Sequence, residues 1–302
     1  MEFLYLLEKI RMPWLTKLML AVTELGGETA FLVIALIVFW CVDKRRGYFL
    51  MSVGFVGTVC NQFLKLFCRI PRPWVLDPGF NAVEEAIPEA TGYSFPSGHS
   101  QSSVGTFGSL AVTAEHSWSR WLYIAAMILV PFSRMYLGVH TPADVLTGVA
   151  ISLMLVFVMR PLVYSDRGMK WLIPGMLAFA AAYVAYVELT PFPADMDPHN
   201  LESGCKSAYT LFGSVAAVAV VYPVERRWVK FTNDALWWAQ ILKIVGGLAV
   251  VLAVKEGLKV PLELILPALP ARAVRYFLVV ITAGMVWPLT FRWFSRMGRK
   301  SR

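Results

Sequence analysis

Long apolar runs separated by short polar loops dominate this chain. A membrane-spanning helix needs about 20 mainly apolar residues, and nine runs of roughly that length follow the first 27 residues. We therefore expect an all-α fold in which about nine transmembrane helices form a polytopic bundle. The expected spans are residues 28–43, 47–68, 98–115, 121–138, 143–160, 171–189, 207–222, 235–254 and 274–294.

The first 27 residues have a different pattern. Leucines such as Leu4 and Leu7 recur at helical spacing among charged residues such as Glu8 and Arg11. Such a mixture is typical of an amphipathic helix that lies on a membrane surface. We therefore divide the chain into an N-terminal interfacial helix, a core and a C-terminal transmembrane extension. These three parts are residues 1–27, 28–162 and 163–302.

The composition favours a membrane protein over a nucleic-acid-binding one. Hydrophobic residues make up 57% of the chain and charged residues only 16%, whereas soluble domains carry about 25% charged residues. The net charge of +8 comes from Lys and Arg in short loops, and no basic stripe or RNA-binding motif is present. We expect the bilayer, and no nucleic acid, as a partner; the sequence does not indicate an oligomeric state.

The four cysteines do not indicate a metal site. None belongs to a C-x-x-C pair, and Cys41, Cys60 and Cys68 lie in or beside apolar runs, where a thiol is usually a small buried hydrophobe. A disulfide between Cys68 and Cys205 is a less favoured alternative, which requires both residues to face an oxidising compartment.

Loop charges predict the orientation of the chain. Two kinds of loop alternate, the basic ones at 43–46, 160–170, 226–230 and the tail 292–302, and the acidic ones at 84–89 and 195–202. Cytoplasmic loops carry an excess of Lys and Arg, so we expect the amino terminus outside and the carboxyl terminus in the cytoplasm. The loops that hold Arg72, His99 and His140 then share the outer side, which is the periplasm, the exterior or a lumen.

One lysine lies inside an apolar run of the C-terminal extension. Lys243 either snorkels toward the inner face or pairs with a carboxylate within the bundle. We favour snorkelling, because Lys243 lies near the predicted inner end of its span.

Polar groups interrupt the apolar pattern in three segments. They are K-L-F-C-R-I-P-R-P at 65–73, F-P-S-G-H-S at 95–100 and S-R-M-Y-L-G-V-H-T-P-A-D at 133–144. In the first, Lys65 and Arg72 are two helical turns apart if the helix continues, so both can reach one anion; alternatively they snorkel at a membrane boundary. Asn61, one turn before Lys65, either supports Lys65 or bonds within the bundle, and we favour the second.

The second segment has the pattern of a helix start. Ser97 is a candidate N-cap, and Gly98 allows the backbone to approach a ligand closely. The N-terminus of a helix attracts anions through its free N–H groups and dipole, and His99 on the first turn would face such an anion. The alternative is an ordinary capped helix with an incidental histidine.

The third segment joins two expected spans. Arg134 ends one span and His140 precedes the next. Asp144 is compatible with two arrangements: a capping box with Thr141, or a hydrogen bond to His140 that fixes its tautomer. Both can hold if they use different carboxylate oxygens.

Together the three segments resemble the signature of the type 2 phosphatidic acid phosphatase superfamily, which is Lys-x6-Arg-Pro, then Pro-Ser-Gly-His, then Ser-Arg-x5-His-x3-Asp. The resemblance implies a helical phosphatase core with added C-terminal spans. It also implies the role of each site residue. Lys65, Arg72, Ser97, Gly98 and Arg134 would bind the phosphoryl oxygens, His140 would form a phosphohistidine, His99 would protonate the leaving oxygen, and Asp144 would orient His140.

We therefore expect an integral-membrane phosphatase that hydrolyses a lipid phosphomonoester or pyrophosphate. Phosphatidate, phosphatidylglycerol phosphate, a polyprenyl pyrophosphate and a sphingoid phosphate all remain open. No carboxylate cluster suited to a metal pair is present, so we expect a metal-independent reaction without a cofactor. The alternatives are a sugar-phosphate phosphatase of the glucose-6-phosphatase type and a non-catalytic lipid transporter or scaffold.

The predicted orientation can be tested by cysteine labelling. Asn81 lies in the loop that we place outside, so an Asn81→Cys variant should react with an impermeant thiol reagent in intact cells. The assay requires a background in which the native cysteines do not react under the same conditions. Labelling that requires cell lysis would contradict the orientation.

Overall fold

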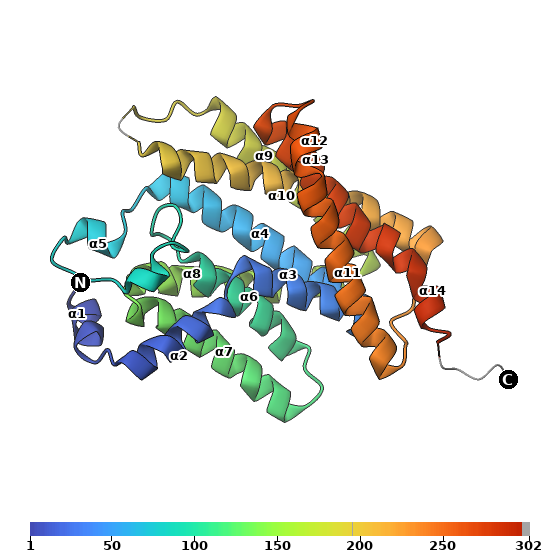
Figure 1. Cartoon of the computed structure of the whole chain (residues 1–302), viewed down its shortest axis with the longest axis horizontal. Coiled ribbons are helices and arrows are strands. Elements are labelled where there is room, and N and C mark those ends of the chain that lie inside the picture. The colour runs from blue at the N-terminus through green and yellow to red at the C-terminus, as the bar shows by residue number, and fades with distance from the viewer. Residues whose placement is uncertain (195, 298–302) are drawn as a thin grey trace. The chain divides into compact units, whose positions relative to one another are not determined.

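The computed structural model describes residues 1–194 and 196–297, and every regular element among them is helical (Figure 1). Asp195 of one acidic loop and residues 298–302 of the basic tail lie outside the described residues. The α-helices are α1 (Glu2–Lys9), α2 (Pro13–Glu24), α3 (Glu28–Ile37), α4 (Lys44–Cys68), α5 (Pro73–Leu76), α6 (Gly98–Val112), α7 (Ser117–Tyr136), α8 (Pro142–Val163), α9 (Asp166–Leu189), α10 (Pro198–Val224), α11 (Trp237–Gly257), α12 (Lys259–Glu263), α13 (Ala268–Ile281) and α14 (Phe291–Phe294). The π and 3₁₀ segments are η1 (Val38–Val42), η2 (Glu84–Ala86), η3 (Glu225–Val229), η4 (Thr282–Val286) and η5 (Trp287–Thr290).

The chain divides into two compact units, each built from three stretches of sequence. The first unit contains Met1–Leu32, Phe49–Pro161 and Pro191–Gly204. The second unit contains Val33–Tyr48, Leu162–Thr190 and Cys205–Arg302. All eight predicted site residues belong to the first unit. The division of the chain at residues 27 and 162 stays a prediction.

Within the described residues, six helical segments are long and apolar enough to cross a membrane. They are Lys44–Leu76, Pro142–Val163, Asp166–Leu189, Pro198–Val229, Trp237–Glu263 and Ala268–Phe294. A seventh span results if Pro13–Glu24 and Glu28–Val42, which meet at a bend of 51°, form one broken span. The polytopic all-α fold is therefore confirmed, whereas the count of nine spans stays a prediction.

The difference in span count arises mainly at α6 and α7. The 15 residues of α6 rise only about 22 Å at ~1.5 Å per residue, which is less than the ~30 Å of a hydrocarbon core. The 20 residues of α7 include Arg120 and Arg134 together with several hydroxyl and aromatic side chains. Both helices contain many polar residues because they belong to the segment that carries the predicted site.

The N-terminal segment forms two helices where we expected one. Pro13 begins α2, and Met12 before it is extended, with φ −130° and ψ 144°. A residue that precedes proline is pushed out of the helical region, so the break follows from the sequence M-P. The location of this segment on a membrane surface stays a prediction.

Both N-terminal helices pack on protein. They contact α7, and the side chain of Leu4 is fully buried. The Arg11 guanidinium donates to the carbonyl oxygens of Tyr136 (3.0 Å) and Asn81. These contacts hold the N-terminal segment against the loop that follows α5, where the Asn81 side chain is exposed.

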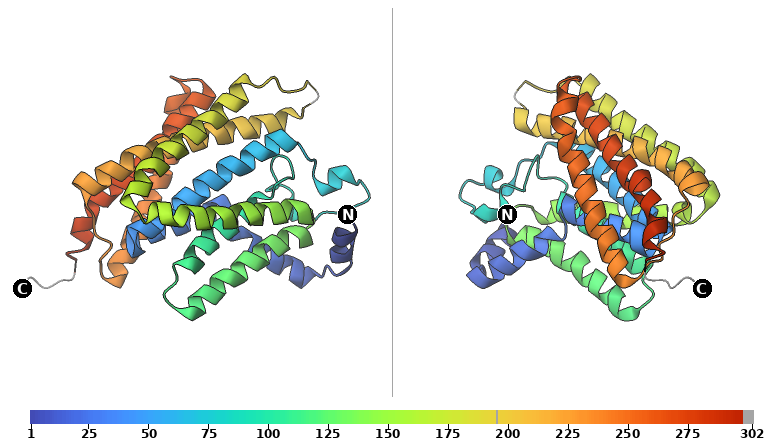
Figure 2. Two further views of the ribbon diagram at one scale, coloured as in Figure 1. Left: turned by 180° about the vertical axis from the view of Figure 1, so that it is seen from behind. Right: turned by 45° about the vertical axis from the view of Figure 1, so that its right-hand side comes forward.

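In Figures 1 and 2, α6 and α7 of the first unit run side by side.

Two glycines allow close approaches in the first unit. Gly138, which follows α7, has φ +78°, and a Cβ there would lie 2.8 Å from ring carbons of Phe80. On α8, a Cβ at Gly148 would lie 2.7 Å from the carbonyl oxygen of Ser97. Gly148 therefore lets α8 pass directly against the start of α6.

In the second unit, the prediction for Lys243 is wrong. Its side chain is fully buried, and the ammonium group donates to the carbonyl oxygens of Trp40 (2.9 Å) and Asn233 (3.3 Å). The ammonium also lies 4.2 Å from the centre of the Phe291 ring. Lys243 neither snorkels nor meets a carboxylate, because backbone carbonyls of η1 and of the irregular segment before α11 accept from its ammonium group.

All four cysteines lie in the described part of the chain, and none forms a disulfide. The alternative of a Cys68–Cys205 bridge is therefore not realised.

A Gly148→Ala substitution tests the close approach of α8 to α6. Alanine is favoured over glycine in a helix by about 1 kcal/mol, but the added Cβ here must displace backbone. We expect a lower melting temperature and lower turnover in detergent. Gly175→Ala on α9 is the control, because its Cβ would meet nothing within 4 Å, and it should be neutral or stabilising. Equal melting temperatures for the two variants would contradict this packing.

Candidate active site

Lys65 and Arg72 meet through a break in the chain and not along one helix. The helix α4 ends at Cys68, and Arg69 is left-handed with φ +52°, so Arg72 is carried back toward Lys65. Lys65 Nζ and Arg72 Nη2 both donate to the carbonyl oxygen of Thr91, at 3.0 and 2.8 Å. Both cations are buried, so neither snorkels toward solvent.

His140 lies between Arg72 and Asp144. Arg72 Nη1 is 2.9 Å from His140 Nε2, and Asp144 Oδ2 is 3.5 Å from His140 Nδ1. A guanidinium can only donate, so Nε2 accepts and the ring proton belongs on Nδ1, which faces the carboxylate. The tautomer is inferred from these partners. His140 and Asp144 are both almost fully buried.

Asp144 forms the capping box, and the same carboxylate oxygen lies near the ring of His140. Oδ2 accepts from the Thr141 backbone N–H at 2.7 Å, while Asp144 N–H donates to Thr141 Oγ1 at 3.3 Å. These bonds form a capping box at the start of α8. The same Oδ2 lies 3.5 Å from His140 Nδ1, so the orienting contact with His140 stays a prediction.

Ser94 is a site residue that the sequence does not indicate. Its hydroxyl is fully buried, donates to Asp144 Oδ2 at 2.6 Å and lies 3.5 Å from His140 Nδ1. Its backbone N–H donates to the carbonyl oxygen of Ile70 at 2.8 Å. Ser94 stands three residues before Ser97, but nothing in that spacing predicts that its side chain turns toward α8.

Ser97 and Gly98 form the start of α6 as expected. Ser97 is the N-cap, and its Oγ accepts from Ser100 N (3.4 Å) and Ser100 Oγ (2.9 Å). The Ser97 N–H donates to the carbonyl oxygen of Asp144 at 3.0 Å, which joins the start of α6 to the start of α8. Asn61 donates to Pro96 O at 3.3 Å, so it bonds within the core.

Among the predicted site residues, Arg134 and His99 have buried side-chain nitrogens without hydrogen-bond partners. Arg134 is fully buried, and its Nη1 donates to Thr23 Oγ1 at 2.8 Å. Its Nε and Nη2, and His99 Nε2, make no hydrogen bond among the described residues. A carboxylate oxygen of Glu89 lies 3.7 Å from His99 Nε2, which is outside hydrogen-bonding distance.

The site therefore concentrates positive charge beside two histidines. The positive charges of Lys65, Arg72 and Arg134 lie close enough to His99 and His140 to interact electrostatically with both imidazole rings. Nearly all buried polar groups in proteins have hydrogen-bond partners, so free guanidinium donors inside a protein are unusual. Chemically, the arrangement can bind a tetrahedral anion, offer a neutral imidazole nitrogen to it, and place a second imidazole nearby.

The described residues contain no group of three or more His, Cys, Asp or Glu side chains that could hold a metal ion. A metal-independent reaction stays a prediction that rests on the chemistry of the histidines and cations.

Comparison with known proteins gives matches to both halves of the chain. A family profile described as "PAP2 superfamily" matches residues 45–167, and one described as "PAP2 superfamily phosphatase, transmembrane extension" matches residues 209–299. Phosphatidylglycerophosphatase B of Bacillus subtilis is 29% identical over 164 residues, which cover 50% of this chain and 76% of that protein.

Two further relatives come from other organisms. Undecaprenyl-diphosphatase of Sulfolobus acidocaldarius is 30% identical over 154 residues, covering 49% of this chain and 70% of that protein. Sphingosine-1-phosphate phosphatase 1 of Mus musculus is 26% identical over 278 residues, covering 84% of this chain and 62% of that protein. The Mus musculus match extends into the C-terminal part of the chain, beyond the three polar segments.

Proposed function

This chain belongs to the PAP2 superfamily, and on that premise we propose that it hydrolyses a lipid phosphomonoester or pyrophosphate through a phosphohistidine. The observation that carries the proposal is the unpaired donor set. Arg134 Nε and Nη2 and His99 Nε2 are buried without partners, beside the Arg72–His140 contact. A phosphoryl group satisfies these donors, which no other group among the described residues does.

The cations and the start of α6 bind the phosphoryl oxygens in this proposal. Lys65, Arg72 and Arg134 neutralise the negative charge of the phosphoryl group. The free backbone N–H groups in the first turn of α6, after Ser97, donate hydrogen bonds to it, and the positive end of the helix dipole attracts it. Phosphoryl transfer is accelerated chiefly by such positioning and charge stabilisation. Arg72 covers His140 Nε2 at 2.9 Å, so the incoming phosphoryl oxygen takes over this guanidinium donor and exposes the nitrogen lone pair.

His140 is the nucleophile. Nε2 forms a bond to phosphorus while the bond to the leaving oxygen breaks, and His99 gives that oxygen a proton. His99, now without the proton, takes one from water as the water attacks the phosphohistidine, which releases phosphate and restores both rings. Asp144 stabilises the positive charge that develops on His140, and Ser94 holds Asp144 Oδ2 in place at 2.6 Å.

The membrane setting and the relatives support a lipid phosphate as the substrate class. The names of the three relatives above specify phosphatidylglycerophosphate, undecaprenyl diphosphate and sphingosine 1-phosphate, so a lipid phosphate is favoured. Glucose-6-phosphatase 3 of Bos taurus is also similar, at 25% identity over 53% of this chain, which keeps a sugar phosphate as the second candidate. We place the site at the outer membrane face, because loop charges predict it there.

A phosphate-release screen in detergent tests the function. We expect release from at least one of phosphatidate, phosphatidylglycerol phosphate, undecaprenyl pyrophosphate and sphingosine 1-phosphate, and less from glucose 6-phosphate. Alanine at His140 or His99 should lower turnover by about a hundredfold or more, and trapped phosphate should be found on His140. Release from glucose 6-phosphate alone would select the second candidate, and no release from any substrate would favour a transporter or scaffold.

Paired substitutions separate the two functions of Asp144. Asp144→Asn removes the charge that faces His140 but keeps an oxygen that can accept from Thr141 and Ser94. We expect a near-normal melting temperature and turnover reduced by about a hundredfold or more, because the corresponding change to the triad aspartate of serine proteases lowers turnover by about ten-thousandfold.

Thr141→Ala is the matched control for capping. It removes Oγ1, the partner of Asp144 N–H, and leaves the carboxylate in front of His140. Loss of a cap lowers stability by about 0.5–2 kcal/mol, so the melting temperature should fall while turnover per folded molecule persists. If Asp144→Asn instead behaves like Thr141→Ala, Asp144 is a helix cap and not an orienting residue.

A further inference from the structure

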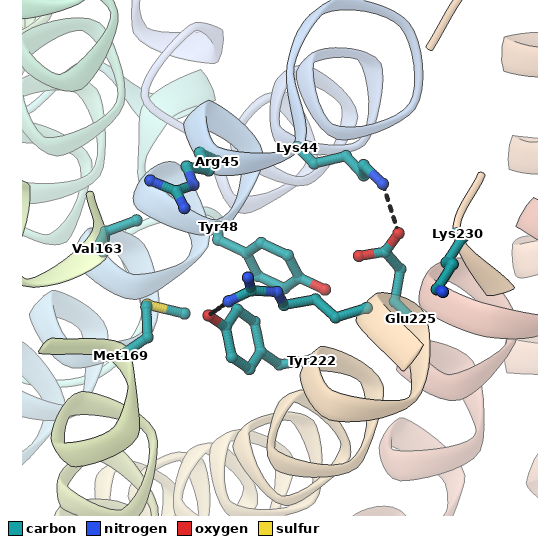
Figure 3. A pocket seen from close by; sticks show the side chains of 9 residues that line it. Lys44, Arg45, Tyr48, Val163, Met169, Tyr222, Glu225 and Lys230 are labelled. Atoms are coloured by element: carbon teal, nitrogen blue, oxygen red, sulfur yellow. Dashed lines mark hydrogen bonds and ion pairs between the residues drawn. The ribbon is translucent and has the colours of Figure 1, made fainter. Parts of the chain in front are cut away.

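A cationic cavity lies within the second unit, and no residue of the proposed active site lines it. Its volume is about 220 Å³, and Figure 3 shows the side chains that surround it. The walls come from the first turn of α4, the end of α8, the first turns of α9, the end of α10 and η3. The lining residues are Lys44, Arg45, Tyr48, Val163, Met169, Tyr222, Glu225, Arg226 and Lys230.

Positive charge exceeds negative charge around this cavity. Four of the lining residues are cations, and two carboxylates contact them. Lys44 pairs with the buried Glu225 at 2.6 Å. Asp166 accepts from Arg45 at 3.0 Å and from Arg226 at 2.9 and 3.3 Å.

The fourth cation, Lys230, is held at the cavity by an unusual backbone. Its φ of +43° is left-handed, a conformation that lysine rarely adopts and that is commonly found at functional positions. The Lys230 N–H donates to the carbonyl oxygen of Glu225 at 2.8 Å, which closes the turn after η3. The side chain has no hydrogen bond or ion pair within the described residues.

The Tyr48 hydroxyl is an unpaired polar group at this cavity. Tyr48 is only 4% exposed, and its hydroxyl makes no hydrogen bond among the described residues. Edge-to-face contacts with Phe39 and Tyr222, at centroid distances of 5.1 and 5.2 Å, fix the ring. Figure 3 shows the hydroxyl directed toward the side that Glu225 and Lys230 line. A buried donor without a partner is destabilising, so a ligand that accepts from it would compensate.

We propose that this cavity binds a phosphate group, carried either by the headgroup of an anionic phospholipid or by free inorganic phosphate. Phosphate accepts several hydrogen bonds and carries the charge that the surplus cations require. Val163 and Met169 form an apolar wall beside the cations, which suits the glycerol and first methylenes of a lipid. Loop charges predict that the flanking basic loops are cytoplasmic, where anionic lipids of the inner leaflet attract such residues.

Three substitutions in the full-length protein test the site. Tyr48→Phe removes only the unpaired hydroxyl and should weaken binding about tenfold, because a hydrogen bond to a charged group is a strong one. Lys230→Ala removes an exposed cation and should weaken binding about threefold. Asp166→Asn removes the carboxylate that competes for Arg45 and Arg226, so it should strengthen binding.

Two controls match these changes. Arg227→Ala removes a neighbouring exposed cation that stacks on Trp228 and does not line the cavity. Tyr209→Phe removes a tyrosine hydroxyl of the same unit that already has a partner, Glu188. Both controls should bind as the wild type does, and size-exclusion profiles establish that all variants are folded.

Binding is read in two arms that distinguish the sources of phosphate. Native mass spectrometry in detergent measures retention of phosphatidylglycerol against phosphatidylcholine, and thermal shift measures stabilisation by inorganic phosphate against chloride at equal ionic strength. The proposed active site also binds phosphate, so the readout is the difference between each variant and the wild type. An effect of Tyr48→Phe in the first arm identifies a lipid headgroup, and an effect only in the second identifies free phosphate.

The proposal is overturned if Tyr48→Phe has no effect in either arm. It is also overturned if Arg227→Ala weakens binding as much as Lys230→Ala does, because the cations then act as a diffuse basic surface. Neither result depends on turnover, so the outcome is independent of the proposed phosphatase activity.

Discussion

The structure of the first unit depends on the burial of three cations beside one carboxylate. Lys65, Arg72 and Arg134 are 6%, 5% and 0% exposed, and Asp144 is the buried carboxylate among them. Burying like charges together is unfavourable unless dipoles or opposite charges compensate. The loop that precedes α6 supplies much of the compensation, because the carbonyl oxygens of Thr91 and Gly92 accept from Lys65 and Arg72.

The same requirement explains the irregular course of that loop. Gly92 has φ +68°, which turns its carbonyl and that of Thr91 toward the cations. The bond from Ser94 N–H to Ile70 O then anchors the loop next to the turn that carries Arg72. Thus the segment between η2 and α6 has no helical structure, because the carbonyls of Thr91 and Gly92 accept from side chains and not from a helix backbone.

Much of this arrangement could be predicted from the sequence. The apolar periodicity predicts the helices, and the three polar segments contain every cation and histidine of the site. Two kinds of contact could not be predicted. They are contacts of backbone carbonyls, which every residue has, and contacts of serine side chains, which are common on protein surfaces. The Thr91 carbonyl has no sequence signal, and Ser94 looks like any loop serine. The break of the N-terminal segment at Pro13 does have a signal, since proline disfavours helix in the preceding residue.

Lys65 and Lys243 show why a buried charge alone does not identify a site. Both lysines lie in apolar helices, where a charged side chain is expected to serve a function. Lys243 is satisfied by the carbonyls of Trp40 and Asn233 and by the face of Phe291, so its charge is fully engaged in holding the second unit together. Lys65 shares its carbonyl with Arg72, near an arginine with two free donors.

The distinguishing feature is therefore that unpaired nitrogens of Arg134 and His99 occur together with Lys65, Arg72 and His140. Around Lys243 the lysine's own neighbours supply its partners, whereas Arg134 retains Nε and Nη2 although the fold could have satisfied them with one more carbonyl. A protein that leaves strong donors unpaired in its interior is less stable than it could be. Such donors are expected where a bound ligand accepts their hydrogen bonds and restores the lost stability. The same criterion, applied to the Tyr48 hydroxyl, separates the cationic cavity of the second unit from an ordinary cluster of surface ion pairs.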